Sequence, residues 1–492
     1  MYGVLRAIAV TAWAGVVVVG VFAAGVLGGS QTGSASAGAA AREQLLVRQL
    51  EVPLPLAVRG ERVEVGYDAQ RGPNLVETPK ATGTLFVRND LQRDFTAVPL
   101  KIRRALQRNS NAGDRLLLRA LVPDRLLGGH KLVYYALIRD RRTGRVVTVP
   151  ARGARAPETT LIINNAYRVN LGTHVFGHPQ TPEAVVARAG PTQVGFGRDG
   201  LVYGPSAFEI ATDRSVWLYD RVNRRVLAWA SGRPNVVART VMLPLFGGGD
   251  FAVGPAGSIY LWRGGLPGSP FSRVTRVSVS GRVLWTSRIA GGLWLRTGPD
   301  GTLYSTGPGP EPSPRTWWGT YPWVPVATSG GRPLSLAAQQ QRTLWAQPLS
   351  SGLQLVRVAT GYDRQLAPHE ARMALLNRAG RVVRAWRIRS RTAIGWSPDK
   401  TPPALVAGDP VIVLEAMGGS GNRTQEYLVL RLGPRGGVRT RFALPYNDPP
   451  RSAYGDSVTA DIRVEPDGKL YQLGSSPDFG AAIYRFSLRR TR

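Results

Sequence analysis

A polar turn followed by a strand of alternating apolar residues recurs through the second half of the chain. The stretches are GPDGTLYST from Gly298, EPDGKLYQL from Glu465, GPAGSIYLW from Gly254 and ATDRSVWLY from Ala211. In such a turn Pro presets φ, Asp bonds back to the backbone and Gly accepts a left-handed conformation. Alternation in the strand places apolar side chains on both faces of a sheet. The repetition therefore predicts one structural unit that is used several times.

The spacing of these turns predicts a β-propeller. Successive turns are 43, 44, 51, 48 and 68 residues apart. A strand-only period of about 40 to 50 residues is typical of propeller blades, each a four-stranded sheet. Because each blade has two apolar faces, we expect six blades to close into a ring over residues 193–492, with a strand near 193–196 completing the last blade. The turn positions are Arg214, Gly257, Gly301, Gly352, Lys400 and Gly468.

Residues 58–165 have a different pattern, in which short alternating runs are separated by turn signals. About seven short strands in roughly a hundred residues favour an immunoglobulin-like (Ig-like) or fibronectin-like β-sandwich. The stretch DRRTG, residues 140–144, predicts a hairpin in which Gly144 has a positive φ. The expected strands include Arg62–Tyr67, Gly83–Asn89, Thr96–Ile102, Arg115–Val122, Lys131–Asp140 and Gly144–Pro150.

The chain begins with an uncharged apolar run of 21 residues, from Ala7 to Leu27. That length is enough for a helix to cross a bilayer. We therefore expect a signal anchor at 1–28, a flexible tether at 29–57 and an extracellular remainder, with residues 166–192 linking the sandwich to the propeller. The alternative is secretion after signal cleavage at a small-residue site such as Ala35-Ser36-Ala37.

Composition narrows the classes of function. The chain has no cysteine, which excludes disulfides, thiol catalysis and cysteine-ligated zinc. The formal net charge is +31, and 58 of the 63 basic residues are arginine, since five are lysine. Such a charge would suggest nucleic acid in a cytosolic protein, but an exported chain is not expected to bind it. We predict a solvated basic surface, with attraction to an anionic envelope polymer as the alternative.

The segment Gly204–Trp229 resembles the NHL-type blade of bacterial extracellular six-bladed propellers. In that pattern an Asp, an Asn and an Arg fix the turn between the second and third strands, and here they are Asp220, Asn223 and Arg225. Other residues that match are Phe208, Asp213, Val216, Leu218 and Val226. The resemblance extends more loosely over the later blades and implies a fold, because propellers carry many activities.

Two groups of residues are candidates for a site in the propeller. The stretch RTWWGTYPW, residues 315–323, concentrates rings that suit a sugar or peptide ligand, or that bury themselves on the propeller. Acidic residues on or near the inner strands are candidates for the central channel, where calcium-dependent lactonases of this architecture hold their metal. The aromatic candidates are Trp317, Trp318, Tyr321 and Trp323, and the channel candidates are Glu209, Asp250 and Glu465.

Further candidates are basic. His174 and His178 have the spacing of a zinc helix, but Gly177 and Pro179 disfavour a helix, so we interpret them as ordinary residues between the two domains. In RAWRIRSR, alternation places Arg387, Arg389 and Arg391 on one face of an outer strand. They are candidates for binding an anionic surface, against a solvated edge strand as the alternative.

These observations favour a non-catalytic binding or scaffolding protein at the cell surface. Its ligand would be a glycan, peptide or protein at the propeller mouth, and no cofactor is predicted. The first alternative is a metal-dependent hydrolase or lyase that acts in the central channel. The second is adhesion to an anionic wall polymer through the arginine-rich faces. The ligand, any bound metal and the oligomeric state are not determined by the sequence.

Overall fold

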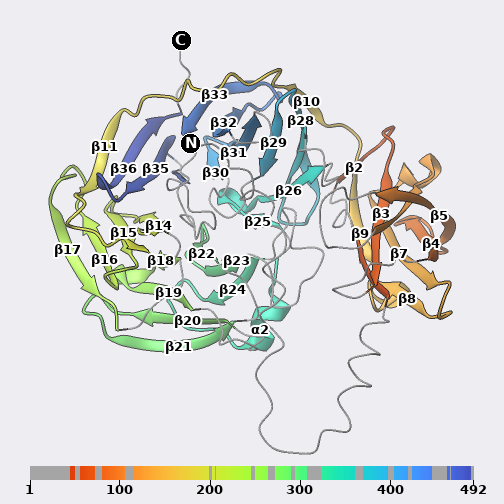
Figure 1. Cartoon of the computed structure of the whole chain (residues 1–492), viewed down its shortest axis with the longest axis horizontal. Coiled ribbons are helices and arrows are strands. Elements are labelled where there is room, and N and C mark those ends of the chain that lie inside the picture. The colour runs from red at the N-terminus through yellow and green to blue at the C-terminus, as the bar shows by residue number, and fades with distance from the viewer. Residues whose placement is uncertain are drawn as a thin grey trace, which may run out of the picture.

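The computed structural model describes two bodies built almost entirely of strands. Figure 1 shows a ring of sheets and, to its right, a smaller body made of the N-terminal strands. The described residues are 45–49, 56–71, 80–105, 115–198, 202–205, 207–244, 250–263, 272–289, 294–306, 323–344, 346–360, 369–396, 404–418, 424–445, 462–465 and 467–488. No helix in these ranges is both long and apolar enough to cross a membrane, and the apolar run 7–27 lies outside them.

The smaller body is a β-sandwich whose two sheets share one long strand. In β5 (Thr96–Ala105), residues 96–100 pair with β4 and residues 101–105 pair with β6. One sheet has the order β1 (Leu45–Gln49), β3 (Glu64–Arg71), β6 (Arg115–Leu121), β5. The other has β4 (Ala81–Asn89), β7 (Lys131–Asp140), β9 (Glu158–Ile163), β2 (Leu56–Val58), with β8 (Val146–Val149) beside β7.

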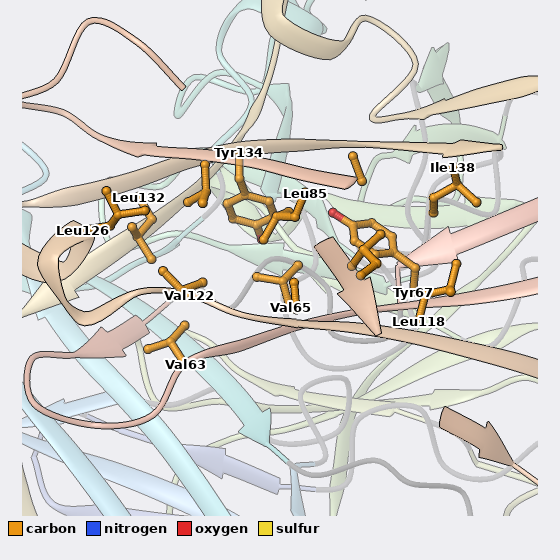
Figure 2. Packing of buried hydrophobic residues seen from close by; sticks show 14 of the residues in the cluster. Val63, Val65, Tyr67, Leu85, Leu118, Val122, Leu126, Leu132, Tyr134 and Ile138 are labelled. Atoms are coloured by element: carbon orange, nitrogen blue, oxygen red, sulfur yellow. The ribbon is translucent and has the colours of Figure 1, made fainter. Parts of the chain in front are cut away.

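Alternation along the strands builds the core of this sandwich. Val65, Tyr67 and Leu118 of one sheet pack against Leu85 and Tyr134 of the other, each at most 2% exposed. Figure 2 shows these side chains meeting between the two layers. Each of these strands places every second residue inward, so apolar burial holds the layers together.

The sandwich differs in detail from the sequence prediction. The hairpin is confirmed, because Gly144 has φ +72° and its N–H bonds to the carbonyl of Asp140 at 2.9 Å. The tether prediction was wrong over residues 45–49 and 56–57, which lie in β1 and β2. Because β5 pairs with both sheets, their strands follow one another in a single continuous order, whereas an Ig-like sandwich has two separate sheets. The Ig-like topology therefore stays a prediction.

The larger body is a six-bladed β-propeller. Blade one is β14 (Ala207–Ile210), β15 (Val216–Asp220), β16 (Arg225–Trp229) and β17 (Val237–Met242). Blade two is β18 (Phe251–Val253), β19 (Ile259–Arg263), β20 (Ser272–Val277) and β21 (Val283–Ile289). Blade three has three strands within the described residues, β22 (Trp294–Thr297), β23 (Leu303–Thr306) and β24 (Trp323–Ala327).

The remaining blades complete the ring. Blade four is β25 (Gln347–Pro348), β26 (Gln354–Thr360), β27 (Glu370–Leu376) and β28 (Val382–Arg389). Blade five is β29 (Ala393–Trp396), β31 (Asp409–Gly418), β32 (Thr424–Leu432) and β33 (Val438–Pro445), with β30 (Ala404–Val406) beside β31. Blade six is β34 (Ile462–Val464), β35 (Lys469–Ser476) and β36 (Gly480–Ser487). Shorter elements are β12 (Gly197–Arg198), β13 (Val202–Tyr203), α2 (Leu336–Gln341) and 3₁₀ turns at Asp124–Gly128, Gly153–Arg155, Pro255–Gly257 and Ser350–Gly352.

The ring is closed by a strand that precedes blade one. Strand β11 (Ala184–Ala189) pairs antiparallel with β36 and becomes the outermost strand of blade six, as the yellow and blue arrows of Figure 1 show. Closure by the chain ahead of blade one was predicted, but the strand lies at 184–189 and not at 193–196. The segment 166–192 is also more than a linker, because β10 (Tyr167–Asn170) pairs parallel with β28.

The repeated turn connects the innermost strand of a blade to the next, as the sequence predicted. In blade three Gly301 has φ +79°, Gly298 N–H bonds to the carbonyl of Thr302 at 2.8 Å, and Thr302 N–H bonds to Asp300 Oδ1 at 3.0 Å. Blade five is the exception: Lys400 lies outside the described residues, and the turn with positive φ is at Ala407 and Gly408. Equivalent positive φ values occur at Arg214, Gly257, Gly352 and Gly468.

The sandwich packs against blade four through apolar and charged contacts. Val58 and Ile163 from the sandwich join a buried cluster with Val356 and Ala374 of the propeller. Glu61, after β2, forms ion pairs with Arg372, at 3.1 Å, and with Arg387. The two bodies therefore share a core of their own at this contact.

We predict that closure by β11 stabilises the ring. Ala187 is 1% exposed, between blades six and one. An Ala187→Asp substitution would bury an unpaired carboxylate there and lower stability by at least about 2 kcal/mol. Ala184→Asp is the matched control, because Ala184 is half-buried and opposite Arg485. Thermal unfolding of the full chain checks this, and equal midpoints for the two variants would contradict it.

Candidate functional site

Inner strands of adjacent blades are joined by two ion pairs at the centre of the ring. Arg463 on β34 of blade six donates from Nη2 to Glu209 Oε1 on β14 of blade one, at 2.9 Å. Arg296 on β22 of blade three donates from Nη1 to Asp250 Oδ2, just ahead of β18 of blade two, at 2.6 Å. Two of the predicted channel carboxylates are therefore bound to arginines that the sequence analysis did not single out.

The arginines occupy equivalent positions in their blades. Arg463 and Arg296 each lie two residues before the first residue of the inner turn, which is Glu465 in blade six and Gly298 in blade three. Each arginine also donates from Nη1 to the carbonyl of the residue before it, at 3.2 and 2.6 Å. Glu209 has the same position in blade one. Aligning the repeats on their turns and comparing the residues two positions before each turn would have identified both arginines.

Because these two ion pairs are buried, loss of either partner is costly in stability. Asp250 is fully buried, and Arg296 and Arg463 are 4% and 6% exposed. Burial lowers the pKa of Arg296 against the attraction of Asp250, while at Arg463 the charge of Glu209 outweighs burial and raises the pKa. Both guanidinium groups stay charged. Removing one partner of such a pair leaves a buried, uncompensated charge, at a cost of about 3 to 5 kcal/mol.

Glu465, the third predicted carboxylate, is in a different situation. It begins the inner turn of blade six, where its N–H bonds to the carbonyl of Lys469 at 2.8 Å. Its carboxylate has no hydrogen bond or ion pair with the described residues. Burial and the nearby charges of Glu209 and Asp467 raise the pKa of Glu465 to about 7, against the opposing effect of Arg463. A half-buried carboxyl that titrates near neutrality therefore lies beside the Glu209–Arg463 pair.

The two histidines do not share a site. His174 is buried, and its ring Nε2 lies 2.7 Å from Glu426 Oε2 on β32. The backbone N–H of His174 donates to Thr392 Oγ1 at 2.7 Å. His178 is exposed. His174 therefore fixes the segment ahead of the propeller to blade five. Within the described ranges, no group of three or more His, Asp or Glu is placed to hold a metal ion.

The aromatic candidates divide between packing and undescribed residues. Trp323 is the first residue of β24 and not part of a loop. It is 6% exposed, and its ring packs edge-on against Tyr304 with centroids 5.8 Å apart. Trp317, Trp318 and Tyr321 lie outside the described residues, so the aromatic platform stays a prediction.

The three arginines predicted to bind an anionic surface differ in exposure. Arg387 is 16% exposed and pairs with Glu370 at 2.7 Å, in addition to Glu61. Arg389, which is 60% exposed, also bonds Glu370 at 2.9 Å, and Arg391 is exposed. The edge-strand interpretation was wrong, because β10 covers β28. Arg387 and Arg389 do share a face, as alternation predicted.

The hairpin residues of blade one have the role that the resemblance implied. Asp220 is fully buried and accepts hydrogen bonds from Gly195 N–H at 3.0 Å, Asn223 Nδ2 at 2.9 Å and Arg225 Nε at 2.9 Å. The carboxylate thereby holds the turn between β15 and β16 and ties it to the chain ahead of the blade. This geometry confirms the expected hairpin; the narrower NHL assignment stays a prediction.

Sequence comparisons assign no family, because neither known family descriptions nor curated proteins match the chain. Among solved structures, a streptogramin B lyase is 11% identical, with 72% of this chain and 90% of that chain covered and a TM-score of 0.27. A virginiamycin B lyase from Staphylococcus aureus with quinupristin is 12% identical, with coverage of 78% and 99% and a TM-score of 0.27. The PQQ-bound aldose sugar dehydrogenase from Streptomyces coelicolor is 11% identical, with coverage of 62% and 98% and a TM-score of 0.30.

The class of protein follows from the chain's own sheets, and the comparisons give no activity. The six sheets arranged around an axis define a β-propeller protein. Identities this low, with TM-scores at or below 0.31, carry no argument about substrate or mechanism.

We predict that Glu465 makes stability depend on pH in a defined window. Its folded pKa, about 7, is above its ordinary value of 4.5, so the folded state holds the proton more tightly. Relative to Glu465→Gln, the wild-type free energy of unfolding should fall as the pH rises from about 4.5 to about 7, and then stay level.

Urea unfolding at several pH values measures this difference. Glu183→Gln is the control, because the hydrogen bond from Lys469 lowers the pKa of Glu183 and moves its contribution to more acidic pH. A wild-type difference from Glu465→Gln that is constant across the window would contradict the prediction.

Proposed function

We propose that the protein is a non-catalytic binding protein that takes a neutral, hydroxyl-rich ligand, a glycan, at the turn end of the inner strands. One observation carries this proposal. Arg463 and Arg296 are ion-paired with Glu209 and Asp250, while the Glu465 carboxylate has no hydrogen-bonding or ionic partner among the described residues. A carboxylate is an acceptor-only group, and sugar hydroxyls are suitable donors to it.

The charges around Glu465 favour a neutral ligand. Glu209 and Asp467 near Glu465 disfavour an anionic ligand at this point. The net charge of +31 disfavours a cationic ligand approaching from solution. A polyhydroxyl compound avoids both penalties. A location at the cell surface, which the apolar N-terminal run predicts, would be consistent with such a ligand.

The arginine partners also weigh against the metal-dependent alternative. A calcium site needs several free oxygen ligands at about 2.3 to 2.6 Å from one ion. Glu209 and Asp250 already accept charge-assisted hydrogen bonds, and Asp250 Oδ2 also accepts from the N–H of Leu295 at 2.8 Å. Metal binding would have to break these bonds, so the binding role is the better-supported proposal.

The test is titration of the full chain with neutral tetrasaccharides, namely cellotetraose, laminaritetraose and chitotetraose. At about pH 8, where a carboxyl with a pKa of about 7 is mostly ionised, we expect at least one to bind. Glu465→Ala should weaken that binding by about tenfold or more, as the loss of a hydrogen bond to a charged group would. Glu465→Gln should retain part of the affinity, because its amide oxygen still accepts.

Glu183→Gln removes an exposed carboxylate that pairs with Lys469, the residue that closes the same turn, and it should leave the affinity unchanged. No binding of any tetrasaccharide, or an equal loss in Glu465→Ala and Glu183→Gln, would contradict the proposal. A bound metal in the purified protein that is lost in Glu465→Ala would favour the alternative.

A further inference from the structure

The contact between the sandwich and blade four forms a cavity of about 720 Å³ that is partly open to solvent. It lies between the end of β9 in the sandwich and the turn that joins β27 to β28 in the propeller. Small-molecule sites commonly have volumes of about 300 to 1,000 Å³ and occur between domains. The cavity is therefore large enough for a ligand, and it is separate from the site around Glu465.

Basic and amide groups line this cavity from several segments of the chain. His130 precedes β7 and Lys131 begins it, Asn164 and Asn165 follow β9, and Arg381 and Arg384 come from the β27–β28 turn and β28. No carboxylate is among the lining residues. Asp90, a carboxylate near the cavity, accepts hydrogen bonds from the backbone N–H groups of His130 and Lys131.

The cationic side chains differ in how they are held. Arg384 donates to the carbonyl of Gly408 at 2.7 Å and lies over the ring of Trp386, at 5.5 Å from its centroid, so it is fixed in place. The side chains of Lys131 and Arg381 have no hydrogen-bonding or ionic partner among the described residues. Lys131 of the sandwich and Arg381 of the propeller therefore line one cavity with no partner among the described residues, beside Arg384, which is held in place.

The contacts around the cavity keep its walls in place. Val58 and Ile163 of the sandwich are buried against Ala374 and Ala385 of the propeller. Glu61 of the sandwich is ion-paired with Arg372 on β27 of the propeller. A preformed cavity binds without a large cost of ordering its walls, which favours a specific site over a transient gap.

We propose that this interdomain cavity binds a phosphate-bearing ligand. A phosphate group has several strong acceptor oxygens that can bond to donors on opposite sides at once, and lysine and arginine both bind it by charge-assisted hydrogen bonds. Lys131 from the sandwich and Arg381 from the propeller supply donors on the two sides, and the amides of Asn164 and Asn165 supply neutral donors. The ligand would link the two bodies.

Calorimetric titration of the full chain at physiological ionic strength tests this. The probes are glycerol 3-phosphate, a monoester, glycerophosphoglycerol, a diester, and glycerol as the neutral comparison. We expect one of the phosphates to bind and glycerol not to bind. Tighter monoester binding would identify a small phosphorylated ligand, and tighter diester binding would identify the backbone of a phosphate polymer or a lipid headgroup.

Three variants separate a site from general surface charge. The double substitution Lys131→Gln, Arg381→Gln should weaken phosphate binding by about tenfold or more. Ala379→Trp should also weaken it, because it fills the cavity without changing the charge. The matched control is Arg239→Gln, Arg273→Gln, which removes two exposed charges from blades one and two.

The control should bind within about twofold of the wild type, since charge far from the cavity is screened. Absence of binding by both phosphates would overturn the proposal. So would an equal loss in the cavity and control double variants, or unchanged binding by Ala379→Trp.

Discussion

The structure depends on the burial of two apolar faces per blade. Leu218 and Trp229 of blade one pack toward Leu473 and Ile483 of blade six, while Tyr219 packs toward blade two. A row of such sheets would leave apolar faces exposed at both ends, so only a closed ring buries them all. Strand β11 makes this closure, because it belongs to the chain ahead of blade one and pairs with blade six.

Closure also sets the chemistry at the centre. It brings β34 of blade six beside β14 of blade one, and the pairing of Arg463 with Glu209 follows from that juxtaposition. Buried ion pairs add little net stability on average, but each partner is costly to remove. Among the described residues, Glu209 and Asp250 are therefore neutralised by arginines, while the Glu465 carboxylate has no hydrogen-bonding or ionic partner.

Much of this architecture could be predicted from local sequence. The turn of Asp300 and Gly301 carries its own conformational signal, so the inner hairpins of every blade but blade five followed from it, and the predicted count of six blades is confirmed. The features that were missed are nonlocal. Strand β11 pairs with residues almost three hundred positions later and has no turn of this kind before it. Glu61 and Arg387 come from different bodies, so no spacing in the sequence relates them.

The candidate site was also predictable only in its local features. Glu209 and Asp250 were predicted as acidic residues near inner strands, but no spacing in the sequence related them to Arg463 and Arg296. Arg296 and Arg463 were overlooked because arginine is usually exposed, in a chain that has 58 of them. Their burial follows from the position two residues before each inner turn. The interdomain cavity needs the arrangement of the two bodies, which no local pattern contains.

Hydrogen exchange of the backbone amides tests ring closure most directly. If β11 is the outer strand of blade six, amides in 184–189 that pair with 480–487 will exchange as slowly as those of the other outer strands, such as β17. Exchange of residues 184–189 at the rate of an unpaired segment, with β36 still protected, would contradict closure by this strand and the arrangement of the centre that depends on it.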